Sequence, residues 1–277
     1  MGNMLVNTRD QKFLLYEQIG IEKLFETEKY ADYNKETVDM MINEAEKLAV
    51  EVLQPTYDKG DKEGCKFEKG RVKVPACFHE AYKKFCEAGW LCCMRSVESG
   101  GQGMPNSVAQ ACYELFQAAN YPLIMYPGLT NGAAGLIDRY GTPEQKKKYM
   151  ERMYTGEWGG TMCLTEPGAG SDVGALKTTA KRLPDGTYSI QGTKIFISSG
   201  DHDLTPNNIH VAHLIIDAGV DTAWVRERFA AARPGTDIPD GALMNPDSIA
   251  ETYLMLHRQR RDAWTHELDL RPYGESW

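Results

Sequence analysis

The spacing of apolar residues changes once along the chain, near residue 158, and this change limits the folds that the chain can adopt. Before it, apolar residues recur every three or four positions, as they do along one face of a helix. After it, short alternating runs are separated by turn sequences such as LPDGT, which is typical of strands and hairpins. The sequence therefore predicts an α+β protein, with helices over 36–155 and mostly strands over 158–200.

Local signals mark where the predicted helices begin and end. The clearest stripe lies within 35–53 and consists of Val38, Met41, Ile42, Ala45, Leu48, Ala49 and Leu53. A second helix is predicted to end at Gly89, and a third to begin at the capping residue Asn106. The glycine-rich segment 96–107 between them is predicted to be a loop. A fourth helix is predicted to begin at Thr142, with Pro143 at its first position and Gln145 placed for a capping box.

Composition and charge exclude several classes of protein. The 277 residues carry a net charge of -8 and the sequence pI is about 5.4, which argues against nucleic acid as a partner. Apolar runs such as VAHLII are too short to cross a bilayer, and the N-terminus lacks the apolar stretch of a secretory signal. The seven cysteines include no C-x-x-C pair, which predicts reduced and mostly buried thiols in a cytoplasmic protein.

A glycine-rich stretch, TEPGAGSDVGAL at 165–176, is the strongest candidate for a cofactor loop. Its glycines are Gly168, Gly170 and Gly174, and Val173 stands where the dinucleotide fingerprint requires its third glycine. A nicotinamide cofactor is therefore not predicted here. Taken alone, the glycines are also explained by a tight bend between two strands.

Two segments together resemble one family. MCLTEPGAGSDVGALKTTA followed by YSIQGTKIFISSG is similar to the acyl-CoA dehydrogenases, at the junction of their helical N-terminal domain and their middle β-barrel. The resemblance extends over about residues 1–208. The segments NTRDQKFLLYEQIG, YGTPEQKKKYM and GDHDL further resemble the branch that includes 3-methylthiopropanoyl-CoA dehydrogenase. The resemblance to the acyl-CoA dehydrogenases implies a helical domain over 1–157 and a partial flavin-binding β domain over 158–208.

The resemblance also implies FAD as cofactor and an acyl-CoA thioester as substrate, and a homo-oligomer is compatible with it. Gly170 and Ser171 would donate to the cofactor phosphate, with Ser171 also close to the acyl-CoA. Phe196 would stack beside the flavin where the family usually has Trp, and Ser198 would replace a Thr near flavin N5. The complete set of implied cofactor-binding residues is Met162, Cys163, Leu164, Thr165, Gly170, Ser171, Phe196, Ile197 and Ser198.

No catalytic residue and no metal ligand is predicted. In this family the base that removes the α-proton is a glutamate of the C-terminal helical domain, so Glu166, Asp172 and Asp185 are not taken as acid/base groups. Glu166 precedes a proline and is interpreted as a structural carboxylate, and Asp185 as a turn residue. His202 lies between Asp201 and Asp203, but two carboxylates and one histidine in a loop are weak grounds for a metal site.

The composition changes again near residue 208. Residues 1–208 contain 18 Lys and 6 Arg, whereas residues 209–277 contain no Lys and 7 Arg. The tail over 209–277 resembles the C-terminal end of a short-chain dehydrogenase, with a strand at 210–216 and a helix at 245–259. It lacks that family's glycine-rich turn, and none of the fourteen tyrosines has Lys four positions on.

The sequence is therefore interpreted as a truncated acyl-CoA dehydrogenase segment joined to a short α/β tail, without the catalytic base and inactive alone. Three alternatives stay open. The first is a non-catalytic protein that binds flavin, CoA or a partner. The second is a nicotinamide oxidoreductase, and the third is a fusion product without selected function. The missing fingerprint counts against the nicotinamide enzyme.

Overall fold

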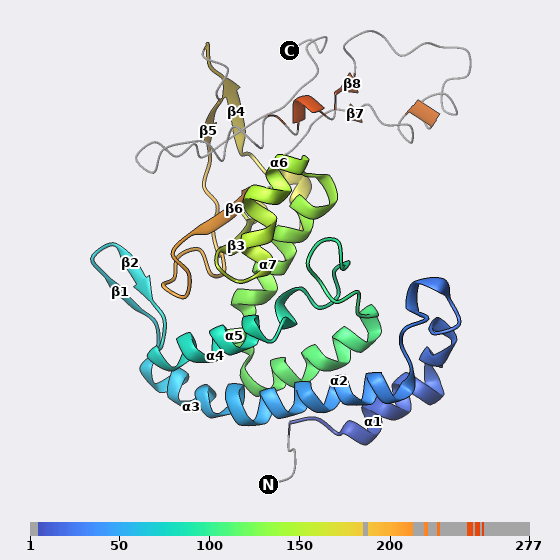
Figure 1. The fold of residues 1–277 in the computed structure, drawn as a ribbon. Coiled ribbons are helices and arrows are strands. Elements are labelled where there is room, and N and C mark those ends of the chain that lie inside the picture. The colour runs from blue at the N-terminus through green and yellow to red at the C-terminus, as the bar shows by residue number, and fades with distance from the viewer. Residues whose placement is uncertain are drawn as a thin grey trace. The chain divides into compact units, whose positions relative to one another are not determined.

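A computed structural model of the chain divides into two compact units. The first contains Met1–Arg139, Lys146–Thr161 and Ser199–Ile209, and the second Tyr140–Gln145, Met162–Ser198 and His210–Trp277. Figure 1 shows the elements of both units. The structure describes residues 5–184, 188–212, 219–220, 226–227, 243–245, 247–249 and 251.

Helices form most of the first unit, as the apolar period predicts. Short 3-10 or π segments, labelled η, interrupt or extend the α-helices. The helical elements are α1 (Thr8–Lys12), η1 (Phe13–Gln18), η2 (Ile21–Leu24), η3 (Glu28–Tyr30), α2 (Lys35–Leu48), η4 (Ala49–Leu53), α3 (Gln54–Glu63), α4 (Ala76–Glu87), η5 (Trp90–Cys92), α5 (Asn106–Tyr140), α6 (Pro143–Gln145), η6 (Lys146–Met150), α7 (Glu151–Tyr154) and η7 (Val173–Ala175).

The predicted helix boundaries are largely confirmed. Asn34 caps α2 by accepting a hydrogen bond from the Thr37 N–H at 2.8 Å. Helix α4 ends at Glu87, two residues before Gly89, whose φ of +77° is the left-handed conformation that glycine adopts at low cost. At the start of α6, the Thr142 N–H donates to Gln145 Oε1 at 2.8 Å and the Gln145 N–H donates to Thr142 Oγ1 at 3.3 Å. These two bonds form the predicted capping box.

The core of the first unit is aromatic and lies between α4, η5 and α5. The Phe116 ring meets Phe85 edge-on at 5.1 Å and Trp90 at 5.0 Å between ring centroids. The α2 stripe is also buried, since Val38, Ile42, Ala45, Ala49 and Leu53 are all fully enclosed. Burial of these side chains supplies the main force that holds the helices together.

Helix α5 consists of two helices joined at Asn120. The backbone there has φ -158° and ψ 82°, which is not helical. The buried Asn120 side chain accepts a hydrogen bond from the Leu123 N–H at 3.0 Å, as an N-cap does, and donates to Thr56 Oγ1 at 2.8 Å. The predicted helix 106–120 is therefore correct in extent, and a second helix follows it directly.

The strands form two-stranded sheets in the described part of the chain, and no closed barrel is seen there. The pairs are β1 with β2, β3 with β6, β4 with β5 and β7 with β8. The strands are β1 (Lys66–Glu68), β2 (Arg71–Lys73), β3 (Gly159–Cys163), β4 (Thr179–Arg182), β5 (Tyr188–Gln191), β6 (Asn208–Ala212), β7 (Gly219–Val220) and β8 (Leu243–Met244).

Two predictions for 158–200 need correction. The segment KIFIS was expected to be a strand, yet residues 192–197 form none. Phe196 has φ +57°, a left-handed conformation that a strand cannot contain. Residues 164–178 likewise contain only the short η7, so this region is less β-rich than predicted. The β4–β5 hairpin is as expected, and residues 185–187 of its predicted turn LPDGT lie outside the described residues.

The β1–β2 hairpin was not predicted. Its register pairs Lys66 with Lys73, Phe67 with Val72 and Glu68 with Arg71. Three-residue strands rich in Lys carry too weak an alternation to be recognised from sequence.

Most of the proposed tail cannot be compared with its prediction. The strand expected at 210–216 is described as far as Ala212, where β6 pairs with β3. Helical residues occur at 247–249 and 251, within the helix expected at 245–259, whose remaining residues lie outside the described part. Among the described residues, none of the helices combines the length and apolar character that a membrane span needs.

Replacing the buried cap Asn120 tests the junction within α5. We expect Asn120→Ala to lower the free energy of unfolding by about 2 kcal/mol, because it removes a cap and leaves buried polar groups without their partner. Asn34→Ala removes an exposed cap and is expected to cost about 1 kcal/mol. Urea unfolding measures both variants. An equal or smaller loss for Asn120→Ala than for Asn34→Ala would show that Asn120 is not the junction's main support.

Candidate functional site

Two segments that are thirty residues apart in sequence lie side by side in the second unit. Met162 and Cys163 end β3, and Leu164 and Thr165 follow at once. The Ile195 N–H donates to the Thr165 carbonyl at 2.9 Å, which brings 162–165 next to 195–198. All but two of the predicted cofactor-binding residues lie in these two segments, and the others, Gly170 and Ser171, lie in the loop between them.

The carboxylate of Glu166 holds this region together. It accepts hydrogen bonds from the Lys177 N–H at 2.7 Å, the Thr178 N–H at 3.2 Å and the Thr178 hydroxyl. The Lys194 ammonium donates to it at 2.8 Å and to the Leu164 carbonyl at 3.1 Å. Because Glu166 and Thr178 are buried, each donor replaces a hydrogen bond that water would otherwise make.

Glu166 is ionised in this setting. Burial by itself would raise its pKa, but the hydrogen bonds from Lys194, Thr178 and the Lys177 N–H outweigh burial and lower the pKa to about 2. A carboxylate with this pKa and with both oxygens occupied is a poor proton acceptor near neutral pH. The contacts therefore agree with the interpretation of Glu166 as a structural carboxylate.

Most of the predicted cofactor-binding residues face solvent. The Phe196 side chain is 85% exposed, and its left-handed φ of +57° is unusual for an aromatic residue. The remaining eight are half-buried or exposed: Met162, Cys163, Leu164, Thr165, Gly170, Ser171, Ile197 and Ser198. A surface of this kind, with a buried ionic anchor beneath it, can bind a ligand from outside without disturbing the fold.

The glycine loop bends tightly and leaves open space around two of its glycines. Glu166 and Ala169 exchange backbone hydrogen bonds at 3.0 and 3.1 Å, which closes the bend. A Cβ atom added at Gly168 or at Gly170 would have no neighbour within 4 Å. The absence of side chains therefore leaves backbone N–H groups that a phosphate can approach closely.

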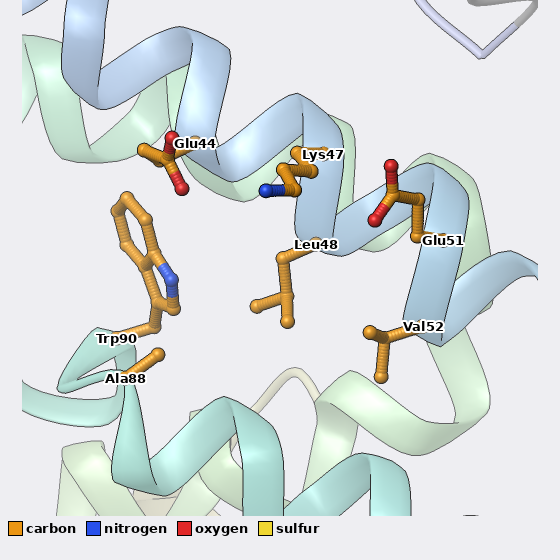
Figure 2. A pocket seen from close by; sticks show the side chains of 7 residues that line it. All are labelled: Glu44, Lys47, Leu48, Glu51, Val52, Ala88 and Trp90. Atoms are coloured by element: carbon orange, nitrogen blue, oxygen red, sulfur yellow. The ribbon is translucent and has the colours of Figure 1, made fainter.

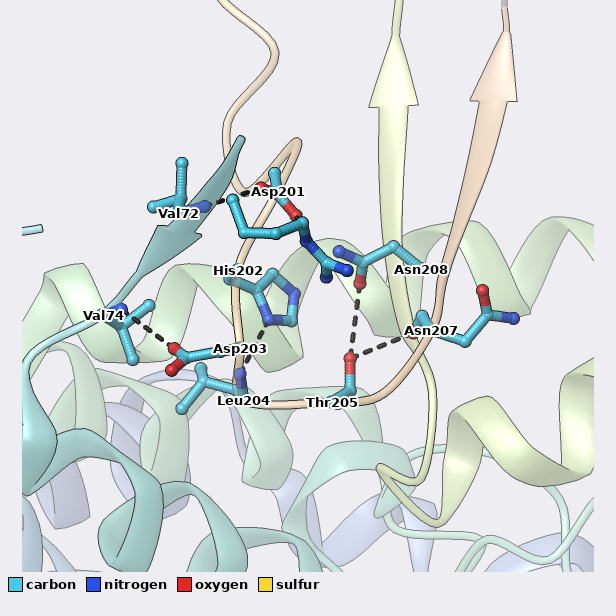
Figure 3. Close-up of polar contacts among 10 residues, drawn as sticks. Val72, Val74, Asp201, His202, Asp203, Leu204, Thr205, Asn207 and Asn208 are labelled. Carbon is cyan, nitrogen blue, oxygen red and sulfur yellow. Dashed lines mark hydrogen bonds and ion pairs between the residues drawn. The ribbon is translucent and has the colours of Figure 1, made fainter. Parts of the chain in front are cut away.

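The GDHDL segment is a structural clamp in the first unit. Asp201 accepts hydrogen bonds from the Val72 N–H at 2.7 Å and from Arg71 Nε at 3.0 Å, and Asp203 accepts one from the Val74 N–H at 2.9 Å (Figure 3). Both carboxylates thus face the β2 strand. Neither is available for the metal site that was weighed for this loop.

His202 points away from the two aspartates. Its Nδ1 accepts the Leu204 N–H at 3.2 Å, and its ring meets that of Tyr126 edge-on at 5.0 Å (Figure 3). Burial lowers the pKa of His202 to about 4, and the opposing influence of Asp201 and Asp203 does not offset it. Within the described ranges, no group of three His, Cys, Asp or Glu side chains is arranged to hold a metal ion.

A cavity of about 340 Å³ lies in the first unit, against α2 and η4 (Figure 2). Leu48, Val52 and Trp90 supply its apolar surface, and Glu44, Lys47 and Glu51 supply charged groups. None of the predicted cofactor-binding residues lines it. The seven cysteines are free thiols, but only three of them, Cys92, Cys93 and Cys112, are buried, so the prediction of mostly buried thiols holds only in part. Cys77, Cys86 and Cys163 are half-buried and Cys65 is exposed.

Two family models match the chain one after the other. The model of the acyl-CoA dehydrogenase N-terminal domain matches residues 35–157, and that of the middle domain matches residues 161–209. Residues 35–209 belong to the acyl-CoA dehydrogenase family. The second match contains both the glycine loop and the Lys194–Ser198 segment, so the site described above lies in the middle domain of that family.

Known proteins that are similar to the chain are also acyl-CoA dehydrogenases. The chain is 38% identical over 182 residues to 3-methylmercaptopropionyl-CoA dehydrogenase of Ruegeria pomeroyi, covering 66% of this chain and 31% of that protein. It is 40% identical over 216 residues to a butyryl-CoA dehydrogenase of Syntrophomonas wolfei, covering 76% and 35%. A solved acyl-CoA dehydrogenase of Bacillus anthracis, complexed with FAD, has 28% identity and a TM-score of 0.52, covering 62% and 28%. The chain thus spans about a third of the length of its curated relatives.

Sequence reasoning missed two of the residues that hold the segments 162–165 and 195–198 together. Lys194 and Thr178 were not singled out, although both contact Glu166. The only signal available was a lysine at the start of the apolar run KIFIS, where a charge needs a partner once it is buried. The sequence does not show that this partner is Glu166, because the two residues come together only when the loop between the segments folds.

The buried His202 makes the first unit sensitive to acid. Its pKa is about 4 in the fold against an ordinary 6.5, so the unfolded chain binds a proton more readily between these values. Stability due to neutral His202 is complete above pH 6.5 and falls as the pH decreases to 4, by up to about 3 kcal/mol. Urea unfolding between pH 7 and 4 measures this loss. We expect His202→Gln to abolish most of this loss of stability at low pH. His79→Gln replaces a half-exposed histidine near Asp203 and should lose as much stability as the unsubstituted chain. An unchanged dependence of stability on pH in His202→Gln would contradict the assignment to His202.

Proposed function

We propose that segments 162–171 and 195–198 form one wall of an FAD site, and that the chain derives from enzymes that dehydrogenate acyl-CoA thioesters. The observation that carries the proposal is the contact of Thr165 with Ile195, which joins the two motifs into one exposed surface. Family membership supports it, as does the FAD complex of the Bacillus anthracis relative. The relatives from Ruegeria and Syntrophomonas support an acyl-CoA substrate and leave the acyl chain open.

The residues present fit FAD. The N–H groups of Gly170 and Ser171 lie in a bend that a phosphate can approach, and the Ser171 hydroxyl adds a donor there that also serves the acyl-CoA. Backbone groups of Met162, Cys163 and Leu164 and the Thr165 hydroxyl would meet the edge of the flavin ring. When bound, FAD supplies the hydride acceptor for the dehydrogenation.

The second segment would cover the flavin ring. Phe196 offers an exposed aromatic face for stacking, and apolar contact from Ile197 would exclude water beside it. The Ser198 hydroxyl would donate a hydrogen bond near the reacting end of the ring. The backbone strain at Phe196 is a feature often found at ligand-binding positions.

We infer that this segment supplies no catalytic base. Glu166 is buried, ionised and fully engaged with Lys194, Thr178 and the Lys177 N–H. Asp172 lies in the glycine loop and is exposed to solvent. The described chain would therefore bind and orient a flavin without removing the α-proton of a thioester.

Binding of FAD to the chain is expected to be weak, because an open wall buries only one side of the cofactor. Titration of the purified chain with FAD, followed by flavin fluorescence, measures the affinity. We expect Phe196→Ala to weaken binding about tenfold, the value of one aromatic stacking contact. The matched control is Phe67→Ala, which removes an exposed Phe from the β1–β2 hairpin and should leave the affinity unchanged. Equal affinity in both variants would place the flavin elsewhere, and tightly held stoichiometric FAD would contradict the open wall.

Dehydrogenation by the chain alone is expected to be absent. The measurement is reduction of an artificial electron acceptor by butyryl-CoA in the presence of saturating FAD. Because no base is available among the described residues of the site, we expect no turnover above the rate without protein. Turnover that is lost in Glu166→Gln would show that Glu166 acts as the base and that its role here is misassigned. FAD binding without turnover would favour a non-catalytic flavin protein.

A further inference from the structure

We infer that Lys194 is the positioning residue of this site, because its ammonium group holds the two flavin-facing segments in register. The role of Lys194 rests on the proposed function for its purpose, and on two contacts of its ammonium group for its geometry. The ammonium nitrogen lies 3.1 Å from the Leu164 carbonyl and 2.8 Å from Glu166 Oε1. One side chain from the second segment thus contacts the first segment and the carboxylate below it.

Lys194 lies in the chain next to the residues that join the two segments. It immediately precedes Ile195, whose N–H bonds to Thr165, and lies two residues before Phe196. Leu164 immediately precedes Thr165. The contact of Lys194 with Leu164 and the hydrogen bond of Ile195 with Thr165 therefore join adjacent residues of both segments and act as a clamp. Because Phe196 and Ser198 follow within four residues, the position of Lys194 sets where their side chains lie.

Burial gives the clamp its strength and its specificity. The Lys194 and Glu166 side chains are only 12% and 7% exposed, so water does not compete well for either charge. A buried ammonium has three N–H groups and requires acceptors for them. The Leu164 carbonyl and the Glu166 carboxylate meet part of this requirement only in one arrangement of the two segments, which selects that register over others.

The ion pair of Lys194 with Glu166 is also connected to the glycine loop, which carries the residues proposed to face the phosphate. Glu166 accepts the Lys177 N–H, the Thr178 N–H and the Thr178 hydroxyl, which closes the far end of the loop that carries Gly170 and Ser171. Lys194 is therefore linked through a single carboxylate to both ends of this loop. Its loss should disturb the ring-facing and the phosphate-facing parts of the surface together.

Amide hydrogen exchange tests the clamp without any ligand. We expect Lys194→Met to speed exchange of the Ile195 amide by about tenfold or more, because local opening no longer has to break the charged contact. Amides within the β4–β5 hairpin should exchange as before. Lys177→Met is the matched control, since it removes an exposed lysine whose backbone N–H also bonds Glu166. Unchanged exchange at Ile195 in Lys194→Met would overturn the inference.

A second set of variants separates positioning from general stability. Lys194→Met leaves Glu166 buried without its cation and should lower the thermal midpoint. Adding Glu166→Gln removes the stranded charge, so the double variant should recover much of that midpoint and still exchange Ile195 rapidly. Lys194→Arg keeps a cation with several donors and should retain partial protection. Recovery of both the midpoint and Ile195 protection in the double variant would show that Lys194 acts only through stability.

FAD titration links the clamp to the proposed function. We expect Lys194→Met and the double variant to bind FAD about tenfold more weakly than the unsubstituted chain, with Lys194→Arg in between. If the unsubstituted chain binds no FAD, the proposed function fails, and the exchange results still decide whether Lys194 sets the register. If FAD binds equally well to all four proteins while exchange at Ile195 rises, the clamp is real and is not used for the cofactor, which overturns the inference.

Discussion

A single buried carboxylate organises the second unit. Glu166 cannot stay ionised away from water unless donors surround it, and the fold brings them from two places in the sequence, 177–178 and 194. Lys194 supplies a cation, and the Lys177 N–H and both donors of Thr178 complete the shell. The glycine loop ends at two of these donor residues, and Lys194 also contacts the Leu164 carbonyl just after β3.

The first unit uses acidic residues in a similar way. Asp201 and Asp203 accept the N–H groups of Val72 and Val74, which tie the β1–β2 hairpin to a loop some 130 residues later (Figure 3). His202 stays neutral between them because it is buried. In both units, residues that look chemically reactive in the sequence are engaged in structural contacts.

This division between anchor and surface is consistent with what the acyl-CoA dehydrogenase family requires of its middle domain. A cofactor wall has to present backbone groups, small residues and an aromatic face in a fixed arrangement. Phe196, with its left-handed backbone and its 85% exposed side chain, lies two residues after Lys194, whose side chain is buried in the ion pair with Glu166.

The sequence by itself determined where most helices begin and end, because periodic apolar residues and the capping box from Thr142 to Gln145 act over a few positions. It also determined the family, since the glycine loop and KIFIS stand at a recognisable spacing. Only the tertiary structure decided that KIFIS is not a strand, that Asn120 divides α5, and that Lys194 meets Glu166. Each of these depends on a partner distant in the chain or on a single backbone angle, and local patterns carry no information on either.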